Sequence, residues 1–363
     1  MTGRGAGGYL DAMAAERSPL PLLAEAETAL REGDAARALD AAEEARRLDP
    51  KEPRALHLKA MALADLGRTE EAREGYRRAV ERGRDDPDVL GDAADFLLNR
   101  AEADPPRDDV EEALSLLRRA SRLARGDDPA LEGELALLEG QALGRLGDPR
   151  GALSRITEAR RRLPGDADVL LERALALFEL CRFEDADAEL DEALRLAPDD
   201  AWAHHAKGRV AERLGRAEEA GRSFARARAL APEDFPEPVA LSPEAFEQAV
   251  EDALVQMPEP VRRYLGNVAI TVEDLPSEEE LLASEPPLSP SILGMFRGAP
   301  LPHKESQDPW SHFPSSISLY QRNLEAFARD REELVDEIGV TLVHEVGHFL
   351  GLDEDDLWDL GLA

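Results

Sequence analysis

The sequence has little cysteine and no long apolar runs, and both shortages exclude whole classes of protein. Its one cysteine, Cys181, cannot form an internal disulfide, and residues 1–8 do not lead into an apolar signal-peptide core. No stretch approaches the ~20 consecutive apolar residues that a membrane-spanning helix needs. We therefore expect a cytoplasmic protein that does not interact with membranes.

Positive charge is also scarce, since the formal net charge is −33 at pH 7. Nucleic-acid binding draws most of its non-specific affinity from clustered Lys and Arg side chains. We therefore expect no nucleic-acid partner. An acidic protein attracts peptides or proteins that are basic or neutral more than acidic ones.

Aromatic residues make up only 5% of the chain, whereas Ala, Leu, Arg and Glu are abundant, which favours helix over sheet. A chain of 363 residues is also longer than a single hydrophobic core usually accommodates. The composition therefore predicts a mainly α-helical chain of at least two domains.

An internal repeat of 34 residues runs through residues 20–232. Three series of small residues and prolines recur at this spacing: Ala152, Ala186 and Ala220; Ala159, Ala193 and Ala227; Pro164, Pro198 and Pro232. Apolar positions recur at three and four residues, a Gly-containing turn divides each unit, and a Pro closes it. Each unit is therefore predicted to form two amphipathic helices.

The repeat resembles the tetratricopeptide repeat, and the last unit carries the resemblance best. Its residues are Gly208, Gly215, Ala220, Phe224, Ala227 and Pro232. The resemblance implies an α-solenoid of about six repeats over residues 20–232, preceded by a flexible N-terminus at residues 1–19. Stacked helix pairs form an extended surface that binds a protein partner. Cys181 replaces a Gly of the neighbouring units, and we expect it to fill a helix crossing as a small buried residue.

A Pro-rich segment at residues 233–241 is predicted to be a flexible linker, because each Pro restricts the residue before it and removes a backbone donor. Ser242 is predicted to be an N-cap, with Pro at the first helical position, and to begin a helix that runs to about Gln256. The segments after this helix include patterns typical of strands. Strands are predicted at residues 267–273, 292–296 and 316–320, and helix is predicted from Asn323 onward.

The sequence His344-Glu345-Val346-Gly347-His348 lies in this helical region. Residues four apart project from nearly the same helix face, so His344 and His348 can place two imidazole nitrogens on one tetrahedral zinc ion. Glu345 lies about 100° around the helix from His344, beside the metal rather than on it. This is the position of a general base that accepts a proton from water.

A third ligand is predicted in the acidic run that follows the helix. Gly351 can take the left-handed conformation that ends a helix and turns the chain back. The long zincin spacing H-E-x-x-H-x-x-G-x-x-ligand then places Glu354 at the third ligand position, with Asp353 and Asp355 as alternatives. The pattern predicts one Zn²⁺ per chain.

Residues 242–363 resemble the minimal zincin-like metallopeptidase family of bacteria. Besides the zinc motif, the matching segments are Phe246-Glu247, Asn267-Val268-Ala269-Ile270, Leu293-Gly294-Met295-Phe296-Arg297-Gly298 and Ile317-Ser318-Leu319-Tyr320. The family more often has Asp at the position of Glu354. The resemblance implies a small α+β domain with a short sheet, an active-site helix and peptidase-type zinc ligands.

Together these features predict a zinc-dependent metallopeptidase that hydrolyses peptide bonds with a metal-activated water and Glu345 as general base. Tyr320 is a candidate oxyanion donor, or strand 316–320 could instead align an extended peptide by edge pairing. The repeats would recruit a peptide or protein substrate, or would cover the cleft.

Two other functions remain open on the sequence. One is a non-catalytic repeat scaffold whose C-terminal domain binds zinc structurally. The other is zinc-dependent hydrolysis of a non-peptide amide.

Overall fold

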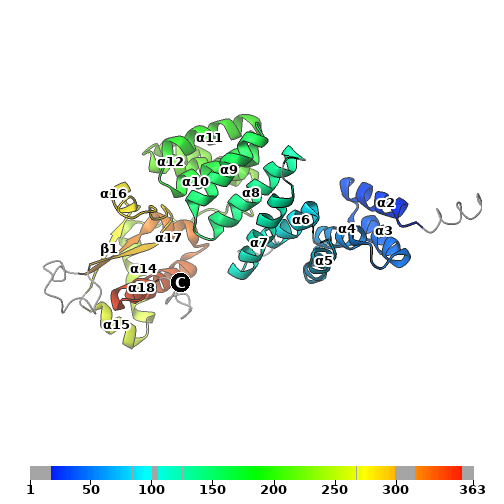
Figure 1. Cartoon of the computed structure of the whole chain (residues 1–363). Helices are drawn as coiled ribbons and strands as arrows, with labels where there is room; N and C mark the ends of the chain where they lie inside the picture. The colour runs from blue at the N-terminus through cyan, green and yellow to red at the C-terminus, as the bar shows by residue number, and fades with distance from the viewer. Residues whose placement is uncertain are drawn as a thin grey trace, which may run out of the picture. The chain divides into compact units, whose positions relative to one another are not determined.

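The structure is a computed structural model that describes residues 18–83, 85–99, 105–124, 126, 128–266, 268–298 and 315–353. Most of the predicted N-terminal segment, residues 1–17, lies outside this range. The chain divides into two compact units, residues 1–176 and residues 177–363. Figure 1 labels their helices and strands. Each unit is described separately.

The first unit consists of helices in consecutive pairs. They are α2 (Leu20–Arg31), α3 (Ala35–Leu48), α4 (Pro53–Asp65), α5 (Thr69–Arg82), α6 (Pro87–Leu98), α7 (Arg107–Leu123), α8 (Pro129–Arg145), α9 (Pro149–Arg162) and most of α10 (Ala167–Glu179). The recurring alanines explain the pairing, because Ala38, Ala45, Ala72 and Ala79 are all fully buried. A small side chain at each crossing lets two helix backbones approach closely.

The second unit begins with the end of the helical array and continues into an α+β domain. Its elements are α11 (Phe183–Leu196), α12 (Ala201–Arg213), α13 (Ala217–Leu230), α14 (Pro243–Gln256), α15 (Glu259–Leu265), β1 (Ala269–Glu273), α16 (Glu278–Leu281), β2 (Gly294–Arg297), β3 (Ser316–Tyr320), α17 (Gln321–Phe327) and α18 (Arg331–Leu350). The predicted mainly α fold with a small α+β domain is confirmed. No helix among the described residues is long and apolar enough to cross a membrane.

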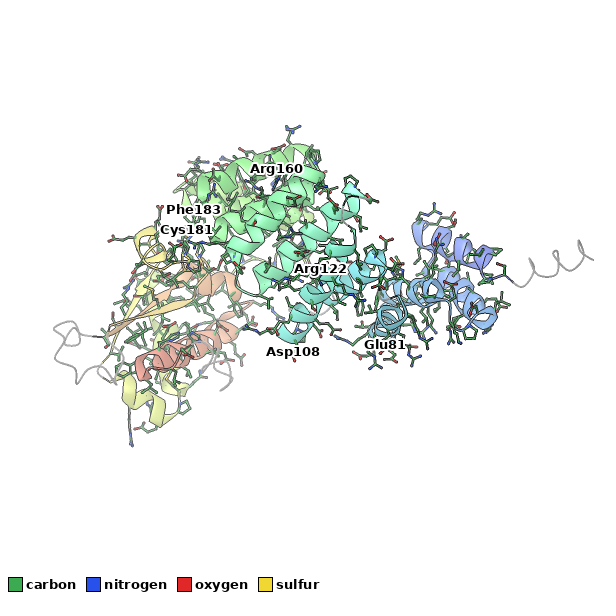
Figure 2. The ribbon with its side chains drawn as sticks, viewed as in Figure 1. Glu81, Asp108, Arg122, Arg160, Cys181 and Phe183 are labelled. Carbon is green, nitrogen blue, oxygen red and sulfur yellow. The ribbon has the colours of Figure 1, made fainter. Side chains whose placement is uncertain are left out.

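In five of the repeats, the turn between the two helices contains a residue in the left-handed conformation. Gly33, Gly67, Gly147 and Gly215 have φ angles of 73°, 69°, 78° and 71° in these turns. Cys181 has a φ of 56° at the same place between α10 and α11, next to Phe183 (Figure 2). The predicted position of Cys181 at a helix crossing is therefore wrong, although the side chain is buried as expected.

Within the described residues, the sheet has three strands in the order β1-β3-β2. β3 pairs in parallel with β1, where Ile270 faces Ile317, and antiparallel with β2, where Gly294 faces Leu319. Because β3 has a neighbour on both sides, the proposal that strand 316–320 aligns a peptide along its edge is wrong. Local alternation predicted the strand but could not predict its central place.

One face of the sheet packs on helices and the other carries polar side chains. Ile317 and Leu319 are buried in a core shared with Phe246 of α14 and Leu342 of α18. The predicted start of α14 is confirmed, because the Ser242 hydroxyl accepts the N–H of Ala245. This core fixes α18 under the sheet.

The segment at residues 233–241, which the sequence predicts to be a linker, has contacts near both of its ends. Phe235 is buried and its ring centroid lies 4.7 Å from that of His205 and 4.8 Å from that of Trp202. At the other end, the Leu241 N–H donates to the Glu325 carboxylate at 2.9 Å. The start of the segment thus packs on α12, and its end is hydrogen-bonded to α17.

We predict that Gly140→Ala destabilises the first unit. Ile156 of α9 occupies the space that a Cβ at residue 140 would need. Overpacking of this kind costs about 1–3 kcal/mol. Urea unfolding followed by circular dichroism measures the loss.

Gly144→Ala, on the same helix, is the matched control. The nearest atom to its added Cβ would be Ala152 Cβ at 3.9 Å, so the exchange should stabilise by about 0.5–1 kcal/mol through helix propensity. Equal effects of the two substitutions would contradict the close crossing of α8 and α9.

Candidate metal centre

The helix that carries the motif, α18, has well-defined ends. The Asp330 carboxylate accepts the N–H groups of Glu332 and Glu333 at the start. At the end, Gly351 has a φ of 90° and Leu352 donates its N–H to the Gly347 carbonyl at 3.1 Å. The predicted left-handed stop at Gly351 is therefore confirmed.

The two histidine rings lie on successive turns of α18, with their planes nearly perpendicular and their Nε2 atoms close together. The Nε2 atoms of His344 and His348 are 3.1 Å apart, and the ring planes are inclined by 83°. Two nitrogens bound to one tetrahedral zinc ion at ~2.0–2.1 Å lie ~3.3 Å apart, so the pair fits a shared cation with little adjustment. The same separation also suits a hydrogen bond between the rings, so the spacing permits metal binding without requiring it.

The turn at the end of α18 orients one of these rings. His348 Nδ1 lies 3.1 Å from the Leu352 carbonyl oxygen. Because a carbonyl only accepts, we assign the proton to Nδ1, which leaves the Nε2 lone pair directed at the position between the rings. Metal-binding histidines generally have such a partner on the second nitrogen.

Glu345 is buried beside β2, with 5% of its surface exposed. Strand and helix approach closely here, since a Cβ on Gly294 would lie 2.6 Å from Thr341 Cγ2 and 3.4 Å from Glu345 Cγ. The rings of Phe296 and Phe349 also pack together, with centroids 5.7 Å apart. We did not predict the role of Gly294, although a glycine in a strand is a usual sign of close backbone approach.

The third ligand stays a prediction. Asp353 is described and exposed, whereas Glu354 and Asp355 lie outside the described residues. Among the residues that the structure describes, no group of three or more His, Cys, Asp or Glu side chains could hold a metal. The described part of the centre is thus the histidine pair with Glu345 beside it.

Tyr320 lies on the other face of the sheet. Ile317 and Leu319 face α18, and side chains alternate along a strand, so Tyr320 points away from the histidines. Its hydroxyl is buried without a hydrogen-bond partner among the described residues. Burial, with a smaller effect of the nearby Glu280 carboxylate, raises the pKa of Tyr320 to about 12. This position does not suit the proposed oxyanion donor.

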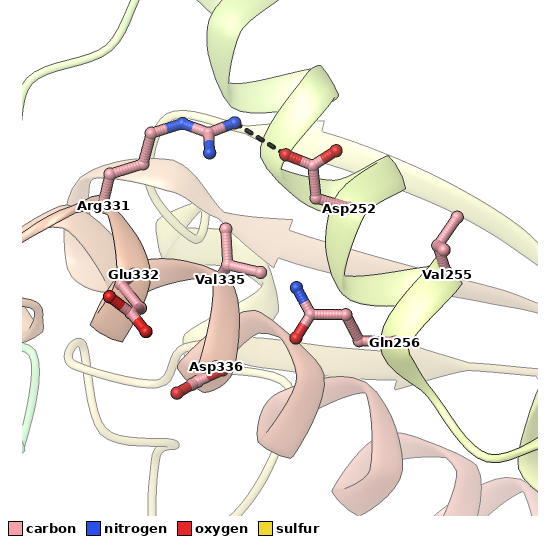
Figure 3. Close-up of a pocket in the computed structure, with 7 residues that line it drawn as sticks. All are labelled: Asp252, Val255, Gln256, Arg331, Glu332, Val335 and Asp336. Atoms are coloured by element: carbon pink, nitrogen blue, oxygen red, sulfur yellow. Dashed lines mark hydrogen bonds and ion pairs between the residues drawn. The ribbon is translucent and has the colours of Figure 1, made fainter.

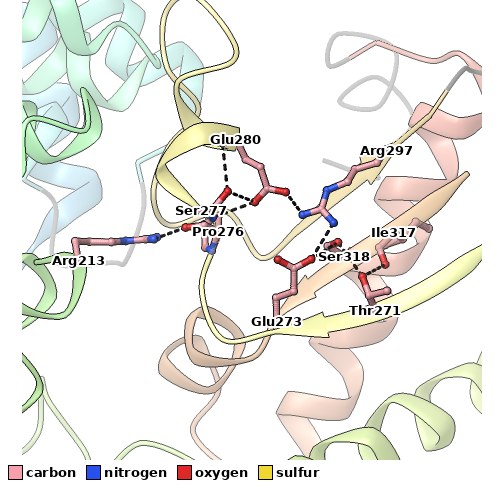
Figure 4. Close-up of polar contacts among 9 residues, drawn as sticks. All are labelled: Arg213, Thr271, Glu273, Pro276, Ser277, Glu280, Arg297, Ile317 and Ser318. Atoms are coloured by element: carbon pink, nitrogen blue, oxygen red, sulfur yellow. Dashed lines mark hydrogen bonds and ion pairs between the residues drawn. The ribbon is translucent and has the colours of Figure 1, made fainter. Parts of the chain in front are cut away.

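A charged cluster holds the strands together on that face (Figure 4). Arg297 of β2 donates to Glu273 of β1 at 2.8 Å and also to Glu280 of α16. Glu273 accepts the Ser318 hydroxyl of β3 at 3.0 Å. The hydrogen bond from Arg297 is the main cause that lowers the pKa of Glu273. One arginine thus ties the edge strand β2 to β1, on the far side of β3, and to α16.

Two pockets lie along α14 and α18. One has a volume of ≈ 510 Å³ and is lined by residues that include Val255 and the ion pair of Arg331 with Asp252, 2.8 Å long (Figure 3). The other, of ≈ 440 Å³, has Met257 and Val343 in its lining. Neither pocket is lined by His344, Glu345 or His348.

We predict that Tyr320→Phe makes folding less sensitive to alkali. Tyrosine ordinarily ionises near pH 10, whereas Tyr320 in the folded chain ionises near pH 12. Between these values unfolding releases a proton, so the stability contributed below pH 10 is lost as pH rises through this window. Urea unfolding at several pH values measures the effect.

The variant should be as stable as the parent at pH 7, because the hydroxyl that it loses makes no hydrogen bond to the described residues. Identical alkaline stability curves for the two proteins would contradict the burial of this hydroxyl.

Family models match both parts of the chain. The model of the Tetratricopeptide repeat family matches residues 29–91 and 145–209. The model of the Zincin-like metallopeptidase family matches residues 265–362. No curated protein matches the sequence.

Solved structures match the helical array. PilF of Pseudomonas aeruginosa is 19% identical, with a TM-score of 0.50 and coverage of 59% of this chain and 92% of its own. PilW, a type IV pilus biogenesis factor, is 20% identical, with a TM-score of 0.52 and coverage of 59% and 94%. The APC/C hetero-tetramer Cut9–Hcn1 is 17% identical, with a TM-score of 0.51 and coverage of 60% and 41%. These likenesses concern the fold alone.

From the matches to the two family models, the chain contains tetratricopeptide repeats within residues 29–209 and a zincin-like metallopeptidase domain over residues 265–362.

Proposed function

We propose that the protein is a cytoplasmic zinc-dependent peptidase whose repeats recruit the substrate. One observation carries the proposal. The Nε2 atoms of His344 and His348 converge at 3.1 Å, and the buried Glu345 follows His344 directly on the same helix. The match of residues 265–362 to the zincin-like family supports zinc as the metal.

His344 and His348 would hold one zinc ion per chain, with Glu354 as the third ligand and Asp353 or Asp355 as its alternatives. Imidazole and carboxylate are the ligands of catalytic zinc sites, which keep one position open. A bound zinc ion supplies a Lewis acid that polarises the peptide carbonyl and lowers the pKa of the attacking water.

Glu345 would act as the general base. Its carboxylate would accept a proton from the attacking water and return it to the nitrogen of the leaving amine. Burial beside β2 supports this role, because a side chain that is 5% exposed next to Gly294 has little room to move. Restricting a catalytic group in this way lowers the entropy that is lost in the transition state.

The substrate would lie along β2 rather than β3. Among the described residues, β2 is an edge strand with β3 on one side only. An extended peptide can add to such an edge through backbone hydrogen bonds. The closeness of Gly294 to Glu345 supports this placement, since a peptide on this edge would run past the general base.

The repeats would bind a peptide or a protein and bring it to the zincin-like domain. Tetratricopeptide repeats bind partners on the surface of their stacked helices. The net charge of −33 favours basic or neutral substrates.

We predict that the purified chain binds about one zinc ion and that His344→Ala or His348→Ala removes it. Each substitution deletes one of two ligands that converge on the same point. Elemental analysis after dialysis measures the metal. His204→Ala is the control, because the His204 ring bonds to the Pro198 carbonyl in the repeats.

Among the three acidic candidates, alanine at Glu354 should weaken zinc binding most. A larger loss at Asp353 or Asp355 would identify another third ligand. Full zinc content in both histidine variants would contradict the site.

We predict that Glu345→Gln keeps zinc and lowers turnover of a peptide by roughly 10²–10⁴-fold, because an amide cannot accept the proton of water. Glu337→Gln is the matched control on the same helix and should keep full activity. A peptide-library assay with metal analysis measures both.

An active Glu345→Gln variant would exclude Glu345 as the base. Zinc binding without cleavage of any peptide or amide, in the parent as well as the variants, would instead favour the structural-zinc scaffold.

A further inference from the structure

Arg213, the last residue of α12, bridges two distant points of the α+β domain. Its Nη1 donates to the Pro276 carbonyl at 2.7 Å (Figure 4), and its Nη2 donates to the Pro290 carbonyl. Both prolines are buried, and burial lowers the pKa of the Arg213 guanidinium. A planar guanidinium presents its donors in a fixed fork, so one side chain can hold both ends of the loop at residues 276–290.

A short series of contacts leads from this loop to the candidate centre. Asn323 Nδ2 donates to the carbonyls of Pro290 and Ile292, at 2.9 and 2.7 Å. The Leu293 carbonyl then accepts the Tyr320 N–H at 2.9 Å. The next residue, Gly294, begins β2 and packs on Glu345. The position of β2 over α18 thus follows from the position of Pro290.

Three further contacts join the helical array to the same domain. Arg209 of α12 donates to the Ser291 hydroxyl, and its guanidinium lies 4.4 Å from the centre of the Phe178 ring. The Arg322 side chain donates to Glu212 at 2.5 Å. The Cys181 thiol lies 3.8 Å from the Leu288 carbonyl.

Cys181 has a backbone conformation that is unfavourable for a residue with a Cβ. Equivalent repeat turns have Gly at this left-handed position, where a Cβ is unfavourable. Among the described residues, Cys181 is the one non-Gly residue with a positive φ. Its side chain contacts the loop at residues 276–290, which a glycine could not do.

We propose that Arg213 is a positioning residue for the proposed reaction, which holds β2 over Glu345 from the last repeat. The inference rests on the proposed peptidase function, but its structural part does not require catalysis. The active centre then depends on α12, and the part of the chain that performs the chemistry begins inside the repeat array.

The test uses the full chain with Arg213→Gln and Arg213→Lys. The Gln side chain is too short to bridge the two carbonyls, whereas Lys can still reach one of them. Hydrogen–deuterium exchange of residues 290–297 should rise roughly 10-fold or more in the Gln variant and less in the Lys variant, because local opening becomes easier. Exchange of α14 and zinc content should stay unchanged.

Peptide kinetics give the second readout. If β2 aligns the substrate, Arg213→Gln should raise KM severalfold and change kcat less, with partial rescue by Lys. Arg216→Gln is the matched control. Arg216 is exposed, and its ion pairs with Asp187 and Glu219 stay within the repeats.

The two proposals fail in different ways. If no variant or parent cleaves peptides while exchange of residues 290–297 rises as expected, the peptidase function fails and the positioning role stands. Unchanged exchange in the Gln variant overturns the positioning role.

If that variant unfolds, Ser291→Ala replaces it as a milder change at the Arg209 contact, and it should raise exchange in the same segment only. A global rise with Ser291→Ala would also overturn the inference.

Discussion

Burial of one face of α18 against the sheet sets the direction of every side chain on that helix. Leu334, Ile338 and Leu342 are fully buried and hold the helix in one rotation. With 3.6 residues per turn, His344 and His348 lie on one face of the helix, and this rotation sets the direction in which that face points. Another rotation would turn the imidazole pair and Glu345 to a different side and remove apolar side chains from the core. The hydrophobic effect therefore arranges the candidate metal site before any metal binds.

The second requirement is that β2 stays close to this helix. Gly294 removes the side chain that would prevent the approach, and Phe296 packs on Phe349. From the opposite face, Arg297 ties β2 to Glu273, and Arg213 of α12 ties the preceding loop to the repeats. The proposed substrate position along β2 therefore lies on a strand that is held from both faces of the sheet.

Local features of the sequence predicted local features of the structure. The Ser242 cap, the left-handed Gly351 and the strand at residues 316–320 were predicted correctly, because capping, glycine conformation and side-chain alternation are decided within a few residues. The order β1-β3-β2 could not be predicted, since alternation does not reveal which strands pair. The same limit explains why the face of the sheet that Tyr320 occupies, and the contacts of Phe235 with α12, could not be predicted, since both depend on residues far apart in the sequence.

Zinc K-edge X-ray absorption on the full chain loaded with one equivalent of zinc tests the central claim most directly. We expect two imidazole nitrogens at about 2.0–2.1 Å from the zinc ion, with oxygen ligands completing the coordination and no sulfur ligand. The imidazole signal should disappear when both His344 and His348 are replaced by alanine. Coordination by the Cys181 thiolate, or an unchanged spectrum in the double variant, would contradict the assignment of the metal to α18.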